Sequence, residues 1–428
     1  MISIRSYREI PQLLRTPFGR MELWKECLDR SWPVLREVTR WYRRLVIRRT
    51  CVIVVTGTYG KTTTQRAITA ALGMEPDAVE KANFQSGVAK ALLLTPPWQR
   101  FAPFEVGISR PGQMIQFARM MQPDIAVVNS IGTEHQRAFK TLENTRDEKA
   151  QLLTGIAPHG IAILNGDDPH VLWMRGTTTR RVITYGFDEG NEVRASDWQM
   201  IWPEGSRFQV HLNGMSYPIR TRLHGRHMAY PVLAALAVVH ATNQDMNAAV
   251  TAMERLTPAR SRMQVVELSN GTRIIQDDYK SSLETIETAL DFLCSIPAAR
   301  RLVVLGNIGD PPGRMGESYR AIGRRFAKFA DLAFLLGSHD RRYASGAAAA
   351  GMPRERIIRF HNDLRQAIDV LRNSLQPGDV LVVKGRLDDH LERITLALSG
   401  QKIGCWRTEC RTRAYRCGNC PMLEKGWQ

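Results

Sequence analysis

An apolar run that leads straight into a glycine-rich loop constrains the fold of this chain more than any other feature. Residues 51–65 read CVIVVTGTYGKTTTQ, which predicts a buried strand, a tight loop and the start of a helix. That arrangement presents backbone N–H groups and a helix N-terminus to a bound anion. We expect Lys61 to reach the terminal phosphates of ATP and Thr62 to hold Mg²⁺. The predicted loop residues are Gly57, Thr58, Gly60, Lys61, Thr62 and Thr63.

The alternation of strands and helices continues along the chain. Short apolar runs, each ending at a polar or glycine-containing turn, read CVIVVTG, DIAVVNS, GIAILNG, RLVVLGN, DLAFLLG and DVLVVKG. Such runs are typical of buried strands in parallel sheets that helices cover. We therefore predict an α/β protein with a phosphate-loop (P-loop) central domain built on a parallel sheet and a C-terminal Rossmann-like domain. Around residues 198–222 the pattern alternates and contains Asn213-Gly214, which predicts an added hairpin.

The predicted domain boundaries follow these changes of pattern. A basic amphipathic extension covers residues 1–50, the ATP-binding central domain 51–257, the C-terminal domain 258–400 and a cysteine-rich tail 401–428. A length of 428 residues accommodates two or three domains.

Composition limits the cellular compartments and the binding partners that we expect for this protein. The sequence has no apolar run near the roughly 20 residues of a membrane span and no secretory signal, so we expect a cytoplasmic protein. Its 59 basic and 42 acidic residues give a net charge of +17. This excess favours acidic partners such as nucleotides, phosphorylated sugars or anionic lipid surfaces. We do not expect a nucleic-acid partner, because no nucleic-acid-binding module signature accompanies the charge.

The first 50 residues form a region of their own, with 12 basic and 5 acidic residues. Apolar residues recur at helical spacing, and Ser31-Trp32-Pro33 predicts a break between two helices. Two interpretations stay open. The apolar stripe could lie on a membrane surface as a peripheral contact, or it could pack on the next domain.

Three further segments make the resemblance to a known family specific. The sequence is similar to the Mur ligases over residues 52–394, beginning with the short TGTxGKTT form of the phosphate loop. FEVGISRPGQM resembles the family segment whose glutamate helps to bind Mg²⁺, which implies this role for Glu105. VVNSIGTEHQRAF resembles a family segment that implies that His135 belongs to a second metal site. EKAQ places Lys149 where the family carries a carbamoylated lysine.

The second half carries the resemblance further. LTPARSRMQ resembles the hinge segment of the family, which implies that Arg262 meets the phosphates when the domains close. IIQDDYKSSLET implies that Asp278 holds the ribose and that Lys280 lies near the γ-phosphate and the carboxylate. GRHMAYPVLAA keeps His227 of a nucleotide-binding motif but has Met228 and Pro231 where the family has asparagines.

The resemblance implies an enzyme that uses ATP and Mg²⁺ to join a small-molecule carboxylate to an amine. The carboxylate would be activated as an acyl phosphate, and the amine would belong to an amino acid or peptide. The implied catalytic residues are Lys61, His135, Lys149 and Lys280.

The chain resembles the tripeptide–D-alanyl-D-alanine ligase branch. Only 55 residues precede Thr56, so we expect no N-terminal domain for a UDP-sugar and doubt a conventional UDP-N-acetylmuramoyl substrate. The alternative is an inactive nucleotide-binding regulatory or scaffold protein, which Met228, Pro231 and Gln151 favour.

The tail concentrates four of the seven cysteines. Cys405, Cys410, Cys417 and Cys420 follow the spacing C-x4-C-x6-C-x2-C, which predicts a structural Zn²⁺ site. An iron–sulfur cluster and four unrelated thiols are the alternatives.

Overall fold

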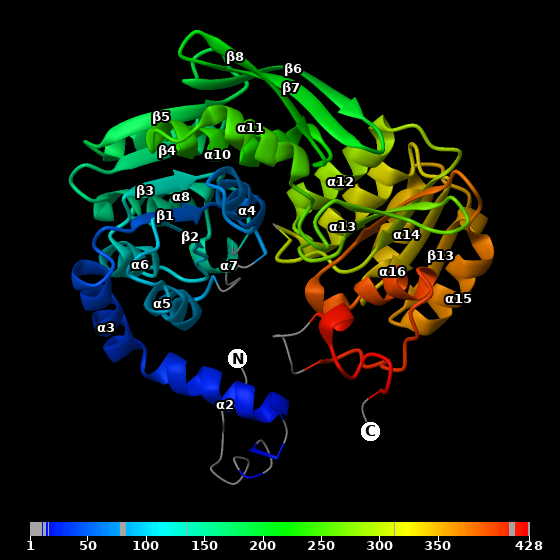
Figure 1. Cartoon of the computed structure of the whole chain (residues 1–428). Coiled ribbons are helices and arrows are strands. Elements are labelled where there is room, and N and C mark those ends of the chain that lie inside the picture. The colour runs from blue at the N-terminus through cyan, green and yellow to red at the C-terminus, as the bar shows by residue number, and fades with distance from the viewer. Residues whose placement is uncertain are drawn as a thin grey trace. The chain divides into compact units, whose positions relative to one another are not determined.

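The chain folds into two α/β units, each built around its own sheet (Figure 1). The computed structural model describes residues 11, 14–15, 17–77, 83–134, 136–311, 313–410 and 416–426. The first unit contains the described residues up to Gln199, together with Arg207–Thr221 and Arg226–Leu256. The second unit contains Met200–Ser206, Arg222–Gly225 and the described residues from Thr257 onward.

The first unit has an eight-stranded sheet in the order β2-β1-β3-β4-β5-β6-β7-β8. Its strands are β1 (Cys51–Thr56), β2 (Phe101–Glu105), β3 (Ile125–Val128), β4 (Ile161–Asn165), β5 (Arg181–Gly186), β6 (Val193–Ile201), β7 (Gly205–Leu212) and β8 (Met215–Thr221). Strands β1 to β5 each run parallel to their neighbours in this sheet, so their carboxyl ends lie at one edge. The predicted hairpin is confirmed: β7 and β8 are joined by Asn213 and Gly214, both with positive φ as a type I′ turn requires.

Helices connect and cover this sheet. They are α2 (Pro17–Arg30), α3 (Trp32–Leu45), α4 (Lys61–Ala71), α5 (Gln85–Leu93), α6 (Met114–Met121), α7 (Gln136–Phe139), α8 (Leu142–Ala150), α9 (Pro169–Trp173), α10 (Ala229–Ala241) and α11 (Met246–Arg255), with short 3₁₀ turns η2 (Leu153–Gly155), η3 (Met174–Thr177) and η4 (Arg226–Met228). Val52 and Val54 of β1 point into the same core as Leu92 of α5 and Phe117 of α6. Burial of this apolar surface is what holds the layers together.

The N-terminal helices match the prediction of two helices with a break. α2 ends at Arg30, and α3 begins at Trp32 with Pro33 in its first turn, where the missing N–H of proline costs nothing. α3 packs beside α5 and α6. The indole of Trp32 donates to Gln116 Oε1 at 2.8 Å, and the hydroxyl of Tyr42 donates to the carbonyl of Thr95 at 2.8 Å. One face of α3 therefore packs on the domain that follows it, while membrane contact stays a prediction.

The second unit has a six-stranded sheet in the order β13-β12-β11-β14-β10-β9, in which only the pair β9–β10 is antiparallel. Its strands are β9 (Gln264–Glu267), β10 (Arg273–Asp277), β11 (Arg301–Leu305), β12 (Leu332–Leu336), β13 (Ile357–His361) and β14 (Val380–Lys384). Its helices are α12 (Leu283–Ser295), α13 (Met315–Phe326), α14 (Asp340–Ala349), α15 (Leu364–Ser374) and α16 (Glu392–Leu398), with 3₁₀ turns η5 (Arg354–Arg356), η6 (Leu387–Asp389) and η7 (Cys417–Asn419). All six apolar runs singled out in the sequence are strands in parallel pairs, which confirms the predicted fold class.

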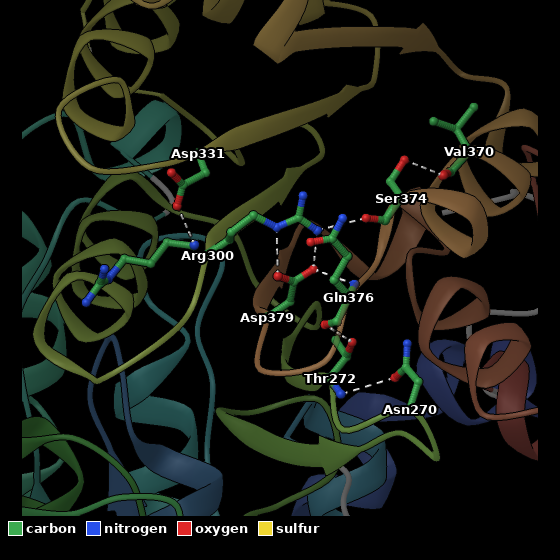
Figure 2. Close-up of polar contacts among 9 residues, drawn as sticks. Asn270, Thr272, Arg300, Asp331, Val370, Ser374, Gln376 and Asp379 are labelled. Atoms are coloured by element: carbon green, nitrogen blue, oxygen red, sulfur yellow. Dashed lines mark hydrogen bonds and ion pairs between the residues drawn. The ribbon is translucent and has the colours of Figure 1, made fainter.

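A partly buried ion pair holds the amino-terminal end of β14 in the second unit (Figure 2). The guanidinium of Arg300 donates to both carboxylate oxygens of Asp379, at 2.9 and 2.6 Å, and also to the carbonyl of Ser374. The Asp379 carboxylate also accepts from the backbone N–H of Gln376, whose carbonyl accepts from the hydroxyl of Thr272. Asp379 is almost fully buried, and the bidentate pairing compensates its charge.

Among the helices that the structure describes, none combines the length and the apolar character needed to cross a lipid bilayer.

Candidate active site

The phosphate loop leaves β1 at Thr56 and ends where α4 begins. Gly60 precedes the helix with φ 77°, a left-handed conformation that glycine adopts without strain. The helical hydrogen-bond ladder starts with the N–H of Thr64 donating to Gly60 O at 2.9 Å, so the N–H groups of residues 61–63 precede it. The Lys61 side chain is 6% exposed, and its Nζ donates to the carbonyls of Gly57 and Thr58 at 2.9 and 3.1 Å. A cation and the N–H groups at the start of a helix thus belong to one short loop, as phosphate binding requires.

The segment after β3 braces this loop. Thr58 N–H donates to Ser130 O at 2.8 Å, Tyr59 N–H to Ser130 Oγ at 3.0 Å, and Gly132 N–H to Thr58 Oγ1 at 2.9 Å. Asn129 Nδ2 donates to Thr64 Oγ1 at 3.0 Å. Short, uncharged side chains and backbone groups therefore hold the loop together.

Gly57 shows why this loop needs glycine. Its φ is 146°, and a Cβ there would lie 3.0 Å from both Asn129 Cβ and the backbone nitrogen of Ser130. A side chain at this position would press against the segment after β3 that braces the loop.

Thr62 and Glu105 meet at the carboxyl ends of β1 and β2. The Thr62 hydroxyl donates to Glu105 Oε2 at 2.5 Å, and Asn83 Nδ2 donates to Glu105 Oε1 at 2.9 Å. Both Thr62 and Glu105 are buried. A hydroxyl and a carboxylate beside a phosphate loop are the oxygen donors that Mg²⁺ prefers, so the residues present fit this ion. Asn83 was missed by sequence reasoning, because its position beside Glu105 depends on how the chain before α5 folds back.

The other predicted residues of the first unit lie on separate elements. Lys149 is in the last turn of α8 and is 4% exposed. His135 lies outside the described residues. His227 is half-buried in η4, with Met228 beside it, and Pro231 is buried in α10. The roles of these residues remain predictions.

The sequence AILNGDDP organises loops around the same sheet edge. Asp168 accepts from Ile131 N–H at 2.8 Å and also caps α9. Asp167 accepts from the backbone N–H of Phe187 at 2.6 Å and from the Tyr230 hydroxyl at 2.9 Å. Both aspartates therefore hold loops at the carboxyl ends of the strands.

The second unit carries Asp278 and Lys280 just after β10. Lys384 at the end of β14 is 2% exposed, and its Nζ donates to Asp277 Oδ2 and to the carbonyl of Lys280, both at 2.6 Å. Asp278 is buried, and Gln276 Nε2 donates to it at 3.2 Å. Burial raises the pKa of Asp278 to about 7, although a hydrogen bond from Ser261 opposes the shift.

Two arginines contact Tyr279, which lies between Asp278 and Lys280 in the sequence. The guanidinium carbon of Arg262 is 4.4 Å from the ring centroid, and that of Arg416 is 4.7 Å from it. Arg416 also donates to the carbonyl of Arg260 at 2.5 Å. Sequence reasoning named Arg262 but missed Arg416, because a tail arginine among several others carries no local signal of its position.

The predicted zinc site is wrong. All four cysteines lie within the described residues and form no disulfide, and in that part of the chain no group of three or more His, Cys, Asp or Glu is placed to hold a metal ion. The buried guanidinium of Arg393 donates to Cys417 Sγ at 3.3 Å and to Cys405 Sγ at 3.7 Å. A cation thus occupies the space beside the two sulfurs. Burial also raises the pKa of Cys417 to about 11, which favours the neutral thiol.

Two family profiles match this chain. The Mur ligase middle domain matches residues 55–239, and the Mur ligase glutamate ligase domain matches residues 261–387. Together they span well over half of the sequence, so the chain belongs to the Mur ligase family of ATP-dependent, peptide-bond-forming ligases, as the motifs predicted.

Within that family, the chain is similar to proteins named UDP-N-acetylmuramoyl-tripeptide--D-alanyl-D-alanine ligase. The Synechocystis protein is 28% identical over 359 residues, which is 80% of this chain and 73% of the relative. The Bacillus subtilis protein is 25% identical over 374 residues, or 86% and 79%.

Solved structures share the fold. MurF from Acinetobacter baumannii superposes with a TM-score of 0.77 at 23% identity, over 87% of this chain and 81% of that one. MurF from Thermotoga maritima, solved in complex with ADP, gives a TM-score of 0.74 at 20% identity, over 86% and 83%.

Proposed function

We propose that this protein is an ATP- and Mg²⁺-dependent ligase that joins a carboxylate to the amine of an amino acid or peptide and forms ADP. Bound ATP would supply the phosphoryl group that turns the carboxylate oxygen into a leaving group. The observation that carries the proposal is the joint position of Lys61, Thr62 and Glu105 at one sheet edge of a Mur ligase middle domain.

The first unit would bind the nucleotide phosphates. The N–H groups at the start of α4 and the ammonium of Lys61 would neutralise phosphate charge. Thr62 and Glu105 would hold Mg²⁺ after the hydrogen bond between them opens. Lys149 and His135 are the candidates for the remaining metal ligands. A carbamate on Lys149 would replace the cationic ammonium group by oxygen donors.

The second unit would contribute its own polar groups. Asp278 is the candidate for the ribose contact. Its carboxyl group is buried, and a buried carboxylate requires hydrogen-bond partners. Lys280, whose carbonyl is held by Lys384, and Arg262 are candidates for contacts with anionic oxygens. His227 is the candidate for a further nucleotide contact in the first unit.

The test is phosphate release from ATP by the purified full chain with Mg²⁺ and bicarbonate. Pools of carboxylates are combined with pools of amino acids and dipeptides. D-Alanyl-D-alanine is the first amine to include, because it appears in the names of the relatives. We expect release that needs both co-substrates, and a product lighter by one water than their sum. Lys61→Ala should abolish it, whereas Lys425→Ala, which removes an exposed lysine of the tail, should not.

The alternative is a nucleotide-binding regulatory or scaffold protein. It is favoured by Met228 and Pro231 at positions where related motifs carry asparagines. Tight binding of ADP without stimulation of phosphate release by any pool, including D-alanyl-D-alanine with peptide carboxylates, would support this alternative and contradict the ligase proposal.

A further inference from the structure

Helix α3 presents an apolar stripe to solvent on the face opposite its packing face. Val34, Val38, Trp41 and Leu45, here called the α3 stripe, are 68, 51, 60 and 65% exposed. Their spacing of four, three and four residues places them on one side of the helix. Single exposed apolar residues are ordinary, but four in one row mark an interaction surface.

The helix cannot turn this stripe inward. Arg43 is buried on the opposite side, where its guanidinium donates to the carbonyl of Met121 at 3.0 Å and to Asp124 Oδ2 at 2.8 Å. Trp32 and Tyr42 make the hydrogen bonds to Gln116 and Thr95 described above. These contacts fix the rotation of α3, so the stripe stays outward.

More apolar surface lies close to the helix. Leu94 and Trp98 are 64 and 84% exposed and flank Thr95, whose carbonyl accepts the hydrogen bond from Tyr42. The stripe is therefore not an isolated row of side chains.

The charge around the stripe is mostly positive. Residues 38–50 contain five arginines and no acidic residue. Arg44, Arg48 and Arg49 are exposed, and the acidic residue of α3, Glu37, is paired with Arg36 and Arg40 at 3.0 and 3.5 Å. An outward tryptophan among apolar residues, with arginines beside it, is the composition of helices that lie in the headgroup region of anionic bilayers.

We propose that the α3 stripe and its neighbouring arginines bind the surface of a bilayer rich in anionic phospholipids. The apolar side chains enter the headgroup boundary, and the guanidinium groups pair with lipid phosphates. The contact is peripheral, in agreement with the absence of a membrane-crossing helix among the described elements. This proposal does not depend on ligase activity.

The test is co-sedimentation of the full chain with extruded vesicles. One set contains equal parts of phosphatidylglycerol and phosphatidylcholine, and the other contains phosphatidylcholine alone, each at 50 and 500 mM NaCl. We expect binding to the anionic vesicles at low salt. Binding should fall several-fold at high salt, where the screening length is only a few ångströms. It should also fall several-fold on the neutral vesicles.

Two double variants sharpen the result. Trp41→Ser with Leu45→Ser should lower the bound fraction at least fivefold. The matched control, Leu172→Ser with Trp173→Ser, removes the same residue types from α9, where both are also exposed, and should bind as the wild type does. Because all four side chains are exposed, circular dichroism should show both variants folded.

Three outcomes would overturn the proposal. These are no wild-type binding to anionic vesicles at low salt, equal binding by the α3 double variant, or equal loss of binding in the α9 control. If the α3 variant instead turns a dimer into a monomer in light scattering without any vesicle binding, the stripe is a contact between two copies of this chain.

Discussion

The phosphate loop of the first unit and the segment Asp277–Lys280 of the second are both held at the carboxyl ends of parallel strands, but by different means. Backbone groups and short uncharged side chains, from the loop and from the neighbouring segment at Asn129–Gly132, hold the loop. Buried charged side chains hold the second segment, above all Lys384, which is 107 residues away from Asp277. Losing one neutral hydrogen bond costs little, whereas losing one partner of a buried ion pair leaves the other charge uncompensated.

The largest expected effect tests the first of these regions. Glu105→Gln keeps the shape of the side chain but removes the negative charge proposed to hold Mg²⁺. We expect a loss of turnover of roughly 1,000-fold with an unchanged unfolding curve. The measurement is phosphate release at increasing Mg²⁺, with Glu189→Gln, whose side chain is 96% exposed, as the control. Full activity of Glu105→Gln at ordinary Mg²⁺ would remove Glu105 from the metal site.

The second prediction tests the buried charges. Lys384→Met keeps the apolar stem but leaves Asp277, which is 14% exposed, without its partner. Loss of one member of a buried pair costs about 3–4 kcal/mol, and we expect this reduction in the free energy of unfolding of the second unit. Urea denaturation measures it, and Lys402→Met, at an exposed lysine, is the control. If Lys384→Met lowers the free energy of unfolding no more than Lys402→Met does, contacts other than the Lys384–Asp277 pair hold this segment.

Asp278 gives the same region a pH dependence. Its pKa is about 7 in the folded protein and near 3.8 when exposed, so the folded state retains the proton over the intervening range. The unfolded state releases it first, so stability falls as pH rises from about 4 to 7 and levels off above that. Between pH 5 and 8 the loss should be roughly 2–3 kcal/mol.

Asp278→Asn isolates this contribution, because an amide does not titrate. The variant should lose less stability than the wild type between pH 5 and 8 in urea denaturation. Parallel pH profiles for the two proteins would contradict the assignment of the titration to Asp278.

The smallest expected effect concerns the tail. Arg416→Ala removes the contact with Tyr279 and the hydrogen bond to Arg260 O, together worth about 1–2 kcal/mol. The docked tail should open more often, and Cys405 and Cys417 should react with a thiol reagent roughly tenfold faster. Arg416→Lys should recover part of the protection, and Lys425→Ala should leave it unchanged. If labelling is as slow in Arg416→Ala as in the wild type, other contacts hold the tail.

Sequence reasoning succeeded where short segments specify their own structure. The glycine and lysine spacing of the loop, the apolar runs of the strands and Asn213-Gly214 are local patterns, and each predicted the element that forms. The zinc prediction failed because cysteine spacing does not reveal that Arg393 lies between Cys405 and Cys417. The amphipathic pattern of α3 predicted a helix but could not separate its packed face from its exposed face.

The sequence by itself determined the two α/β units, the phosphate loop and membership of the Mur ligase family, because these rest on residues close together in the chain. Only the tertiary structure decided that Asn83 reaches Glu105, that Lys384 pairs with Asp277 and that Arg416 contacts Tyr279. The physical reason is that such contacts join segments far apart in sequence, and they form only where packing of the apolar cores brings those segments together.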